Sequence, residues 1–331
     1  MPHTGWGSLP KYQAGPLVKP KRLKPGDTIG LVAPGFAVKP DVLQKALKTL
    51  EKMGFKTHHT SRILGNHGYF SDTDPQRALD LNEMFANPEI DGILCARGGY
   101  GCTRILDLLD YNAIRANPKT LIGFSDVTAL LQAIHKRTGL VCFHGPVGST
   151  LDDPYGQKYF NKVLIRGKDS LEIKNLKLKD AEHLENPEYD RYTILPGIGE
   201  GPLIGGSLTL VASLIGTAHE MDFTDKLVFL EDVGEAPYRM DRMLTQLIHG
   251  STFPKAAGII FGVCLDCDRE KKTDNFTLRE VLMDRIAPLG IPAAYGMSFG
   301  HVPGNFTLPL GIRAAFDAGK MRLELLEAAV V

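Results

Sequence analysis

Residues 120–136 read TLIGFSDVTALLQAIHK and contain an apolar run, one serine and a helical pattern in direct succession. The run at 120–124 is typical of a buried strand, and apolar residues follow over 126–136 in helical spacing. The same order of strand, turn and helix recurs at 28–53 and at 90–109. Strands that alternate with helices predict a parallel sheet with helices on both faces, and therefore an α/β fold.

Two helix starts in this half carry capping signals. Asp41 is expected to cap a helix that runs to Met53 and ends at Gly54, and Asp74-Pro75 to open a helix over 77–85.

The regular alternation weakens between about residues 150 and 191, where charge rises and residues 162–178 resemble an exposed strand or a connector. Beyond it, the sequence predicts strands at 226–230, 257–263 and 293–299 and helices at 238–248 and 278–286. We therefore expect four parts: an N-terminal extension (1–22), a first α/β domain (23–150), a linker (151–191) and a second domain (192–331).

The composition is that of an ordinary globular protein without net charge. Apolar residues make up 43% and charged residues 23%, and Lys plus Arg equal Asp plus Glu at 38 each. Nucleic-acid binders usually carry a basic excess, so this class is disfavoured. Neither a signal peptide nor a membrane-spanning run is visible, and the five cysteines suit a reducing compartment, so we expect a cytoplasmic protein.

Cys264 and Cys267 form one C-x-x-C, but the second pair of a structural zinc site is missing. We predict two ordinary thiols, with redox or metal chemistry as the alternative, and expect neither a metal nor a cofactor.

Ser125 lies where a predicted strand meets a helix, in Gly123-Phe124-Ser125-Asp126. A serine on such a sharp turn is held exposed near the free N–H groups of the helix start, which can stabilise an oxyanion. This arrangement is the nucleophile elbow, although Val127 leaves the usual G-x-S-x-G pattern incomplete. The alternative is that Ser125 only caps the helix.

A glycine-rich turn, Arg97-Gly98-Gly99-Tyr100-Gly101, follows another predicted strand. Its glycines allow the backbone to approach a ligand closely, so it could supply a second oxyanion N–H or hold a phosphate. It is neither G-x-G-x-x-G nor a P-loop. A tight turn without a ligand is the alternative.

Glu231 follows an apolar strand of the second half, at the sheet edge where open α/β folds place their sites. Asp232 and Glu235 compete for any role given to it, and a solvated strand end is the alternative reading.

His301 follows the last strong strand, in the loop Gly300-His301-Val302-Pro303-Gly304-Asn305. A histidine on a loop held by a rigid strand is well placed as a general base. His144 is its main competitor, and a structural histidine is the alternative.

Ser125, Glu231 and His301 together supply a nucleophile, an acid and a base, each placed after a strand. A serine needs a base to become nucleophilic, and the base needs an orienting acid. Because the serine lies in the first half and the other two in the second, we expect the site in the cleft between the two domains.

At these residues the sequence resembles the LD-carboxypeptidase family of serine peptidases, the muramoyltetrapeptide carboxypeptidases. The matching motifs span about residues 23 to 318, in the family's order: LKPGDTIGLVAPG (23–35), DPQRALDLNEMFANPEIDGILCARGGYG (74–101), IGFSD (122–126), GGSLTLVASLIGT (205–217), VFLEDVGEAPYRMDRMLTQL (228–247) and GHVPGN (300–305).

The resemblance implies a catalytic triad of Ser125, Glu231 and His301, with an oxyanion hole formed by backbone N–H groups at Gly99 and Asp126. It implies a flavodoxin-like first half, a β-rich second half, no metal, and usually a homodimer. The implied reaction removes a terminal D-alanine from a murein tetrapeptide during cell-wall recycling in the cytoplasm.

The substrate's carboxylate needs a cationic partner, and Arg97 and Arg239 are both candidates. Gly98, next to Arg97 in the glycine-rich turn, is also expected to bind the substrate. A second function within the family is the cleavage of aminoacyl-nucleotide antibiotics, which would be expected to use an aromatic residue for base stacking. The only tryptophan is Trp6, outside the matched region, so murein peptides are favoured. A non-catalytic nucleotide or phosphate binder is the alternative from another class.

Overall fold

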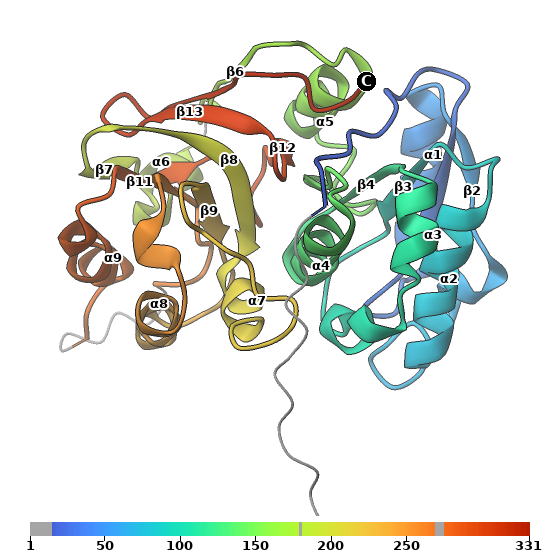
Figure 1. The fold of residues 1–331 in the computed structure, drawn as a ribbon, viewed down its shortest axis with the longest axis horizontal. Coiled ribbons are helices and arrows are strands. Elements are labelled where there is room, and N and C mark those ends of the chain that lie inside the picture. The colour runs from blue at the N-terminus through green and yellow to red at the C-terminus, as the bar shows by residue number, and fades with distance from the viewer. Residues whose placement is uncertain (1–14, 179–180, 269–274) are drawn as a thin grey trace, which may run out of the picture.

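The structure is a computed structural model and describes residues 15–178, 181–268 and 275–331. Its strands form two sheets that lie side by side, with helices packed on and between them (Figure 1). The strand order is β12-β5-β4-β3-β1-β2 in the first sheet and β6-β14-β13-β8-β9-β10-β11-β7 in the second.

Five strands of the first sheet are parallel and come from the first half of the chain. They are β1 (Thr28–Val32), β2 (Lys56–His58), β3 (Gly92–Cys95), β4 (Thr120–Gly123) and β5 (Phe143–His144). Their order, β2-β1-β3-β4-β5, is that of flavodoxin-like folds, so the predicted fold of this half is confirmed. The order reverses beside β1, and the carboxyl ends of β1, β3 and β4 meet there, which is where such folds bind ligands.

The helices of this half are α1 (Pro40–Lys52), α2 (Asp74–Ala86), α3 (Tyr111–Ala116), α4 (Thr128–Thr138) and α5 (Pro154–Phe160). Short 3-10 segments occupy Ser61–Leu64, Cys102–Leu108 and Ser125–Val127, and a π-helical turn covers Asn161–Ile165.

Three details of the sequence prediction were wrong here. Both helices begin earlier in the chain than predicted, with proline at the first or second helical position. The N-cap of α1 is Lys39, so Asp41 lies in the first turn, and the N-cap of α2 is Thr73, so Asp74 is the first helical residue. Residues 102–108 form a 3-10 segment instead of an α-helix.

The second sheet is larger and mixed. Its centre is parallel: β8 (Ile198–Ser207), β9 (Leu227–Glu231), β10 (Gly258–Gly262) and β11 (Ala293–Met297). Antiparallel strands flank it, namely β6 (Leu171–Ile173), β7 (Tyr192–Leu195), β13 (Arg313–Asp317) and β14 (Arg322–Leu325). The predicted β-rich second half is therefore confirmed.

The helices of the second half are α6 (Ala181–Glu185), α7 (Leu208–Ser213), α8 (Pro237–Gly250) and α9 (Leu278–Ile286). Three 3-10 segments add Pro187–Tyr189, Phe253–Lys255 and Ala287–Leu289. In the parts of the chain that the structure describes, every helix is too short or too polar to cross a membrane.

The two sheets are joined by α4 and by a short strand. Figure 1 shows α4 between the first sheet and α7, and α4 contacts both α7 and β8. Gln132 of α4 donates to the carbonyl of Gly205 at 3.1 Å, and Thr128 Oγ1 accepts the N–H of Ser207 at 3.0 Å. β12 (Leu308–Pro309) pairs with β5, so the chain joins the first sheet briefly before β13 and β14 return to the second. The domain boundaries drawn from the sequence stay predictions.

Candidate active site

The backbone at Ser125 is strained. Phe124 continues β4 in extended conformation, and Ser125 then adopts a φ of 63° before the 3-10 turn and α4. A non-glycine residue in the left-handed region costs about 1–2 kcal/mol, and such strain gathers at functional sites. The side chain is left half-buried at the carboxyl end of β4. This conformation is that of a nucleophile elbow.

The glycine-rich turn after β3 packs directly against this serine. A Cβ added at Gly98 would lie 2.8 Å from Ser125 Cβ and 3.0 Å from its Oγ, so no larger residue fits without a shift. Gly99 has a φ of 130°, which L-residues avoid, and a Cβ there would lie 2.5 Å from the Phe36 ring. Gly98 therefore allows the turn to contact the elbow, and Gly99 allows the same turn to pack against Phe36.

His301 and Glu231 form a hydrogen-bonded pair. Glu231 is the last residue of β9 and is fully buried, and its Oε2 accepts the Nδ1–H of His301 at 2.8 Å. His301 lies four residues beyond β11, on a loop closed by a bond from Gly300 N–H to Asn305 Oδ1 at 3.2 Å. Because the carboxylate only accepts, this bond leaves Nε2 of a neutral His301 free to act as a base.

The two groups shift each other's pKa in opposite directions. Burial disfavours the charged form of His301, but the Glu231 carboxylate and its hydrogen bond outweigh burial and raise the His301 pKa. Burial likewise opposes ionisation of Glu231, but the charge of His301 and the shared hydrogen bond lower the Glu231 pKa. The carboxylate therefore stabilises the imidazolium that a general base becomes.

The elbow and the acid–base pair meet through Phe124. The ring of this residue, which directly precedes Ser125, packs edge-on against the His301 ring with centroids 4.9 Å apart. Residues from both sheets are therefore brought to one place. Among the described residues, Ser125 Oγ has no hydrogen-bond partner, and such bonds often tighten only when substrate is bound.

The competing histidine is buried in an aromatic cage. His144 packs against the rings of Phe124, Phe229 and Phe299, and neither ring nitrogen has a partner among the described residues. Burial lowers its pKa to about 4, so it is neutral at physiological pH.

The competing carboxylates are occupied elsewhere. Asp232 accepts hydrogen bonds from the backbone and side chain of Thr209 and from its neighbour's N–H, and burial, followed by the charge of Glu231, raises its pKa to about 6. Glu235 pairs with Arg239 at 3.4 Å. Glu231 is the one of the three that contacts His301.

The two candidate arginines lie in different settings. Arg97 precedes Gly98, donates to the carbonyl of Ala37 at 3.2 Å and lies over the Phe36 ring. Arg239 is exposed in the first turn of α8. Arg97 therefore directly precedes Gly98, the residue that packs against Ser125.

A cavity of about 550 Å³ opens beside His301 and could receive a substrate. Its walls include Phe124, Gly300 and Asn305, and Lys45 and Asp152 form a 2.8 Å ion pair on its side toward α1.

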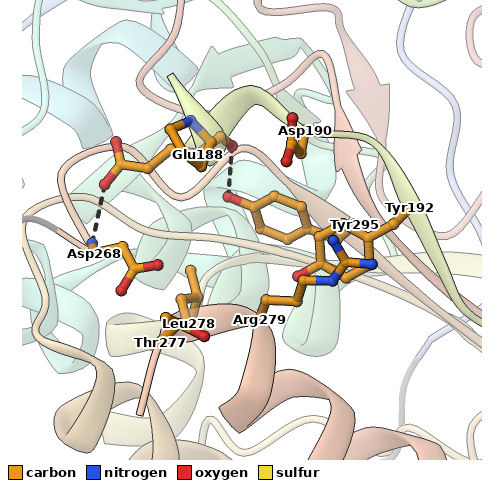
Figure 2. A pocket seen from close by; sticks show the side chains of 9 residues that line it. Glu188, Asp190, Tyr192, Asp268, Thr277, Leu278, Arg279 and Tyr295 are labelled. Carbon is orange, nitrogen blue, oxygen red and sulfur yellow. Dashed lines mark hydrogen bonds between the residues drawn. The ribbon is translucent and has the colours of Figure 1, made fainter. Parts of the chain in front are cut away.

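Figure 2 shows a smaller pocket of about 190 Å³, lined in part by Tyr192, Arg279 and Tyr295. The carbonyl of Glu188 accepts from the Tyr295 hydroxyl, and its carboxylate accepts from Asp268 N–H. These bonds fasten the segment before β7 and the loop after β10 to β11. None of the predicted site residues lines this pocket.

Two side chains near the elbow were not predicted: the carboxylate of Asp126 accepts the N–H of Cys102, directly after the glycine-rich turn, and the guanidinium of Arg77 donates to the carbonyl of Gly101 in that turn. The only sequence signals were the position of Asp126 next to the serine and the place of Arg77 one turn into a helix.

Two family models match the chain and leave only its ends and a central segment uncovered. The LD-carboxypeptidase N-terminal domain matches residues 29–145, and the LD-carboxypeptidase C-terminal domain matches residues 200–316.

Curated relatives are similar over nearly their whole length. A probable murein peptide carboxypeptidase of Bacillus subtilis is 38% identical over 94% of this chain and 95% of its own. A murein tetrapeptide carboxypeptidase of Pseudomonas aeruginosa is 31% identical over 89% and 94%.

The microcin C7 self-immunity protein MccF of Escherichia coli is also similar, with 30% identity over 91% of this chain and 94% of its own. A structure of MccF in complex with aspartyl sulfamoyl adenosine is 27% identical, covers 95% of this chain and all of that one, and superposes with a TM-score of 0.84. The chain therefore belongs to the LD-carboxypeptidase family of serine peptidases and is a carboxypeptidase-type hydrolase.

Proposed function

We propose that this protein is a serine LD-carboxypeptidase that hydrolyses the amide bond to the C-terminal D-alanine of murein tetrapeptides. The observation that carries the proposal is the 2.8 Å bond between His301 and the buried Glu231, beside a serine with strained backbone. The murein carboxypeptidase names of the relatives support the substrate class.

In the proposed acylation step, His301 Nε2 takes the proton of Ser125 as its oxygen attacks the amide carbonyl. Glu231 holds the His301 ring in the tautomer with Nδ1 protonated and stabilises the cation that forms. The N–H groups of Gly99 and Asp126 bind the developing oxyanion. The imidazolium then protonates the leaving nitrogen, and D-alanine departs.

Deacylation repeats these roles with water. His301 takes a proton from the water that attacks the acyl-enzyme, and the tetrahedral intermediate collapses to a free carboxylate and Ser125. A carboxypeptidase must also hold the substrate's terminal carboxylate. We assign Arg97 to this contact because its neighbour Gly98 packs on Ser125, whereas Arg239 is engaged by Glu235.

The experiment that tests this proposal is incubation of the purified protein with a murein tetrapeptide, with D-alanine release followed by mass spectrometry. We expect release of D-alanine and a tripeptide product. Tripeptide and pentapeptide substrates serve as controls for a requirement for the tetrapeptide length. No release from the tetrapeptide would contradict the substrate assignment.

A second candidate function is cleavage of aminoacyl nucleotides, supported by the likeness to MccF and by aromatic side chains near the glycine-rich turn. Tyr69 and Tyr100 are exposed, with ring centroids 6.0 Å apart, and could stack on a base. Trp6 lies outside the described residues. Parallel assays with the tetrapeptide and an aspartyl-nucleotide amide decide between the two by their kcat/KM values.

We further propose that the protein acts in the cytoplasm on recycled wall peptides, and as a homodimer. Size-exclusion chromatography with light scattering checks the oligomeric state, and the dimer predicts about twice the 36.2 kDa chain mass.

A further inference from the structure

The carboxylate of Asp126 ties the elbow to the glycine-rich turn. This side chain is 1% exposed, and its Oδ2 accepts the N–H of Cys102, the residue directly after the glycine-rich turn, at 2.9 Å. A Cβ at Gly35 would lie 3.0 Å from the same oxygen, so the loop after β1 packs on it too. This carboxylate, which lies in the segment after β4, therefore contacts the segments that follow β1 and β3.

Arg77 holds the same turn from the other side. Its side chain is fully buried, its Nη1 donates to the carbonyls of Gly101, at 3.0 Å, and of Pro34, and its Nε donates to the carbonyl of Asp72 at 3.2 Å. Its Nη2 forms an ion pair with Asp74. A buried guanidinium is tolerated only when its donors are paired, as they are here.

The peptide group that joins Gly101 to Cys102 is thus held at both of its polar atoms by buried charged side chains, at its carbonyl by Arg77 and at its N–H by Asp126. The turn is only five residues long, and two residues before Gly101 lies Gly99, the proposed oxyanion donor. Gly98 rests on Ser125 in the same turn. A shift of about 1 Å in such a turn would move the Gly99 N–H away from the oxyanion, and misplacements of this size can reduce rates about 10²-fold.

We propose that Asp126 and Arg77 are positioning residues for the oxyanion site, which keep the Gly98–Gly99 turn seated on the elbow. The inference rests on the proposed acyl transfer at Ser125. The carboxylate acts through the backbone of Gly101 and Cys102 and does not touch the substrate.

The unpaired oxygen of Asp126 gives the inference a sharp test. Its Oδ1 has no hydrogen-bond partner among the described residues. An asparagine can place its carbonyl oxygen where Oδ2 lies and its amide where Oδ1 lies, so Asp126→Asn keeps an acceptor for the turn. Asp126→Ala removes the acceptor altogether.

The experiment compares Asp126→Ala, Asp126→Asn and Arg77→Met by D-alanine release from a murein tetrapeptide. We expect kcat to fall about 10²-fold in Asp126→Ala and in Arg77→Met, near the loss of one oxyanion donor, with KM changed by less than about threefold. Asp126→Asn should retain at least about a tenth of wild-type kcat. The acid limb of the pH profile should stay in place in all three, because the His301–Glu231 pair is intact.

Lys119→Met is the matched control for simple destabilisation. Lys119 is buried in the same half, and its ammonium donates to the carbonyls at the end of α2, at Met84 and Asn87. We expect it to lower the melting temperature without lowering kcat below that temperature. Wild-type kcat in Asp126→Ala, or losses that follow the unfolded fraction in all variants alike, would overturn the inference.

The test also separates this inference from the proposed substrate. A wild-type protein that releases no D-alanine but is labelled by a fluorophosphonate would contradict the substrate class alone. The rate of labelling then becomes the readout, since phosphonylation of Ser125 uses the same N–H groups, and the same ranking of variants is expected. Equal labelling rates in the wild type and in all the variants would overturn the inference.

Discussion

The two sides of the candidate site, the turn at Ser125 and the pair of Glu231 and His301, depend on different physical interactions. The first depends on backbone geometry: a serine with a φ of 63° and a glycine turn within contact distance of it. The second depends on charge: a fully buried carboxylate bonded to a half-buried imidazole. Substitutions on the first side should therefore act sterically and independently of pH, and those on the second should change the pH dependence.

The largest expected effect is that of Ser125→Ala, which removes the nucleophile. Turnover should fall about 10⁶-fold in a folded protein. Circular dichroism and melting temperature check the fold, and D-alanine release checks the activity. The melting temperature of Ser125→Ala should equal or exceed that of the wild type, because the substitution removes only the side-chain oxygen and leaves the backbone of the elbow in place. Full residual activity would refute the assignment of Ser125.

Glu231→Gln comes next and tests the charge-dependent side. The wild type should lose kcat/KM as pH falls through the His301 pKa, because the base must be neutral, and this pKa lies above its ordinary value. Glutamine keeps the shape but not the charge, so kcat should fall about 10⁴-fold, as for loss of a triad acid. The acid limb should also move to lower pH. A pH–rate profile from pH 5 to 9 measures both, and an unmoved limb would contradict the pairing.

Gly98→Ala tests the geometric side at a smaller scale. The new methyl group would lie 2.8 Å from Ser125 Cβ, so the turn must shift and kcat should fall about 10²-fold with the acid limb unmoved. Gly319→Ala is the control, because a Cβ there meets only ordinary contacts, the nearest at 3.5 Å. A moved limb in Gly98→Ala would show that the two sides are not independent.

The smallest expected effect concerns substrate binding. Arg97→Ala should raise KM about 10- to 100-fold through loss of a charge-assisted contact, and Arg239→Ala should change it little. Steady-state kinetics on the tetrapeptide and on its C-terminal amide give the comparison, since the amide should be insensitive to Arg97→Ala. A larger effect of Arg239→Ala would reverse the assignment.

The sequence predicted three strands of the first sheet, β1, β3 and β4, because they are buried and read as short apolar runs. It missed β2, which is largely exposed, and β5, which has only two residues. Because Ser125, Glu231 and His301 each follow an apolar run, the sequence also predicted that they lie at the carboxyl ends of strands, although Glu231 is the last residue of β9 and does not follow it. The strands of the second sheet that are half-exposed or glycine-rich, such as β8 and β13, were missed because their burial depends on partners distant in sequence.

The choice among competing groups also needed the structure. His144, Asp232 and Glu235 have side chains as suitable as those of His301 and Glu231, and only tertiary contacts separate them. Arg77 was overlooked because nothing in its local sequence shows that a helix will bring it beneath a turn 24 residues away.

Reaction with a fluorophosphonate, followed by peptide mapping, tests the central claim most directly. We expect the wild type to carry one added group, on Ser125, and labelling to slow by at least about 10³-fold in His301→Ala because the serine loses its base. A label on any other residue, or a protein that releases D-alanine yet is never labelled at Ser125, would contradict the account.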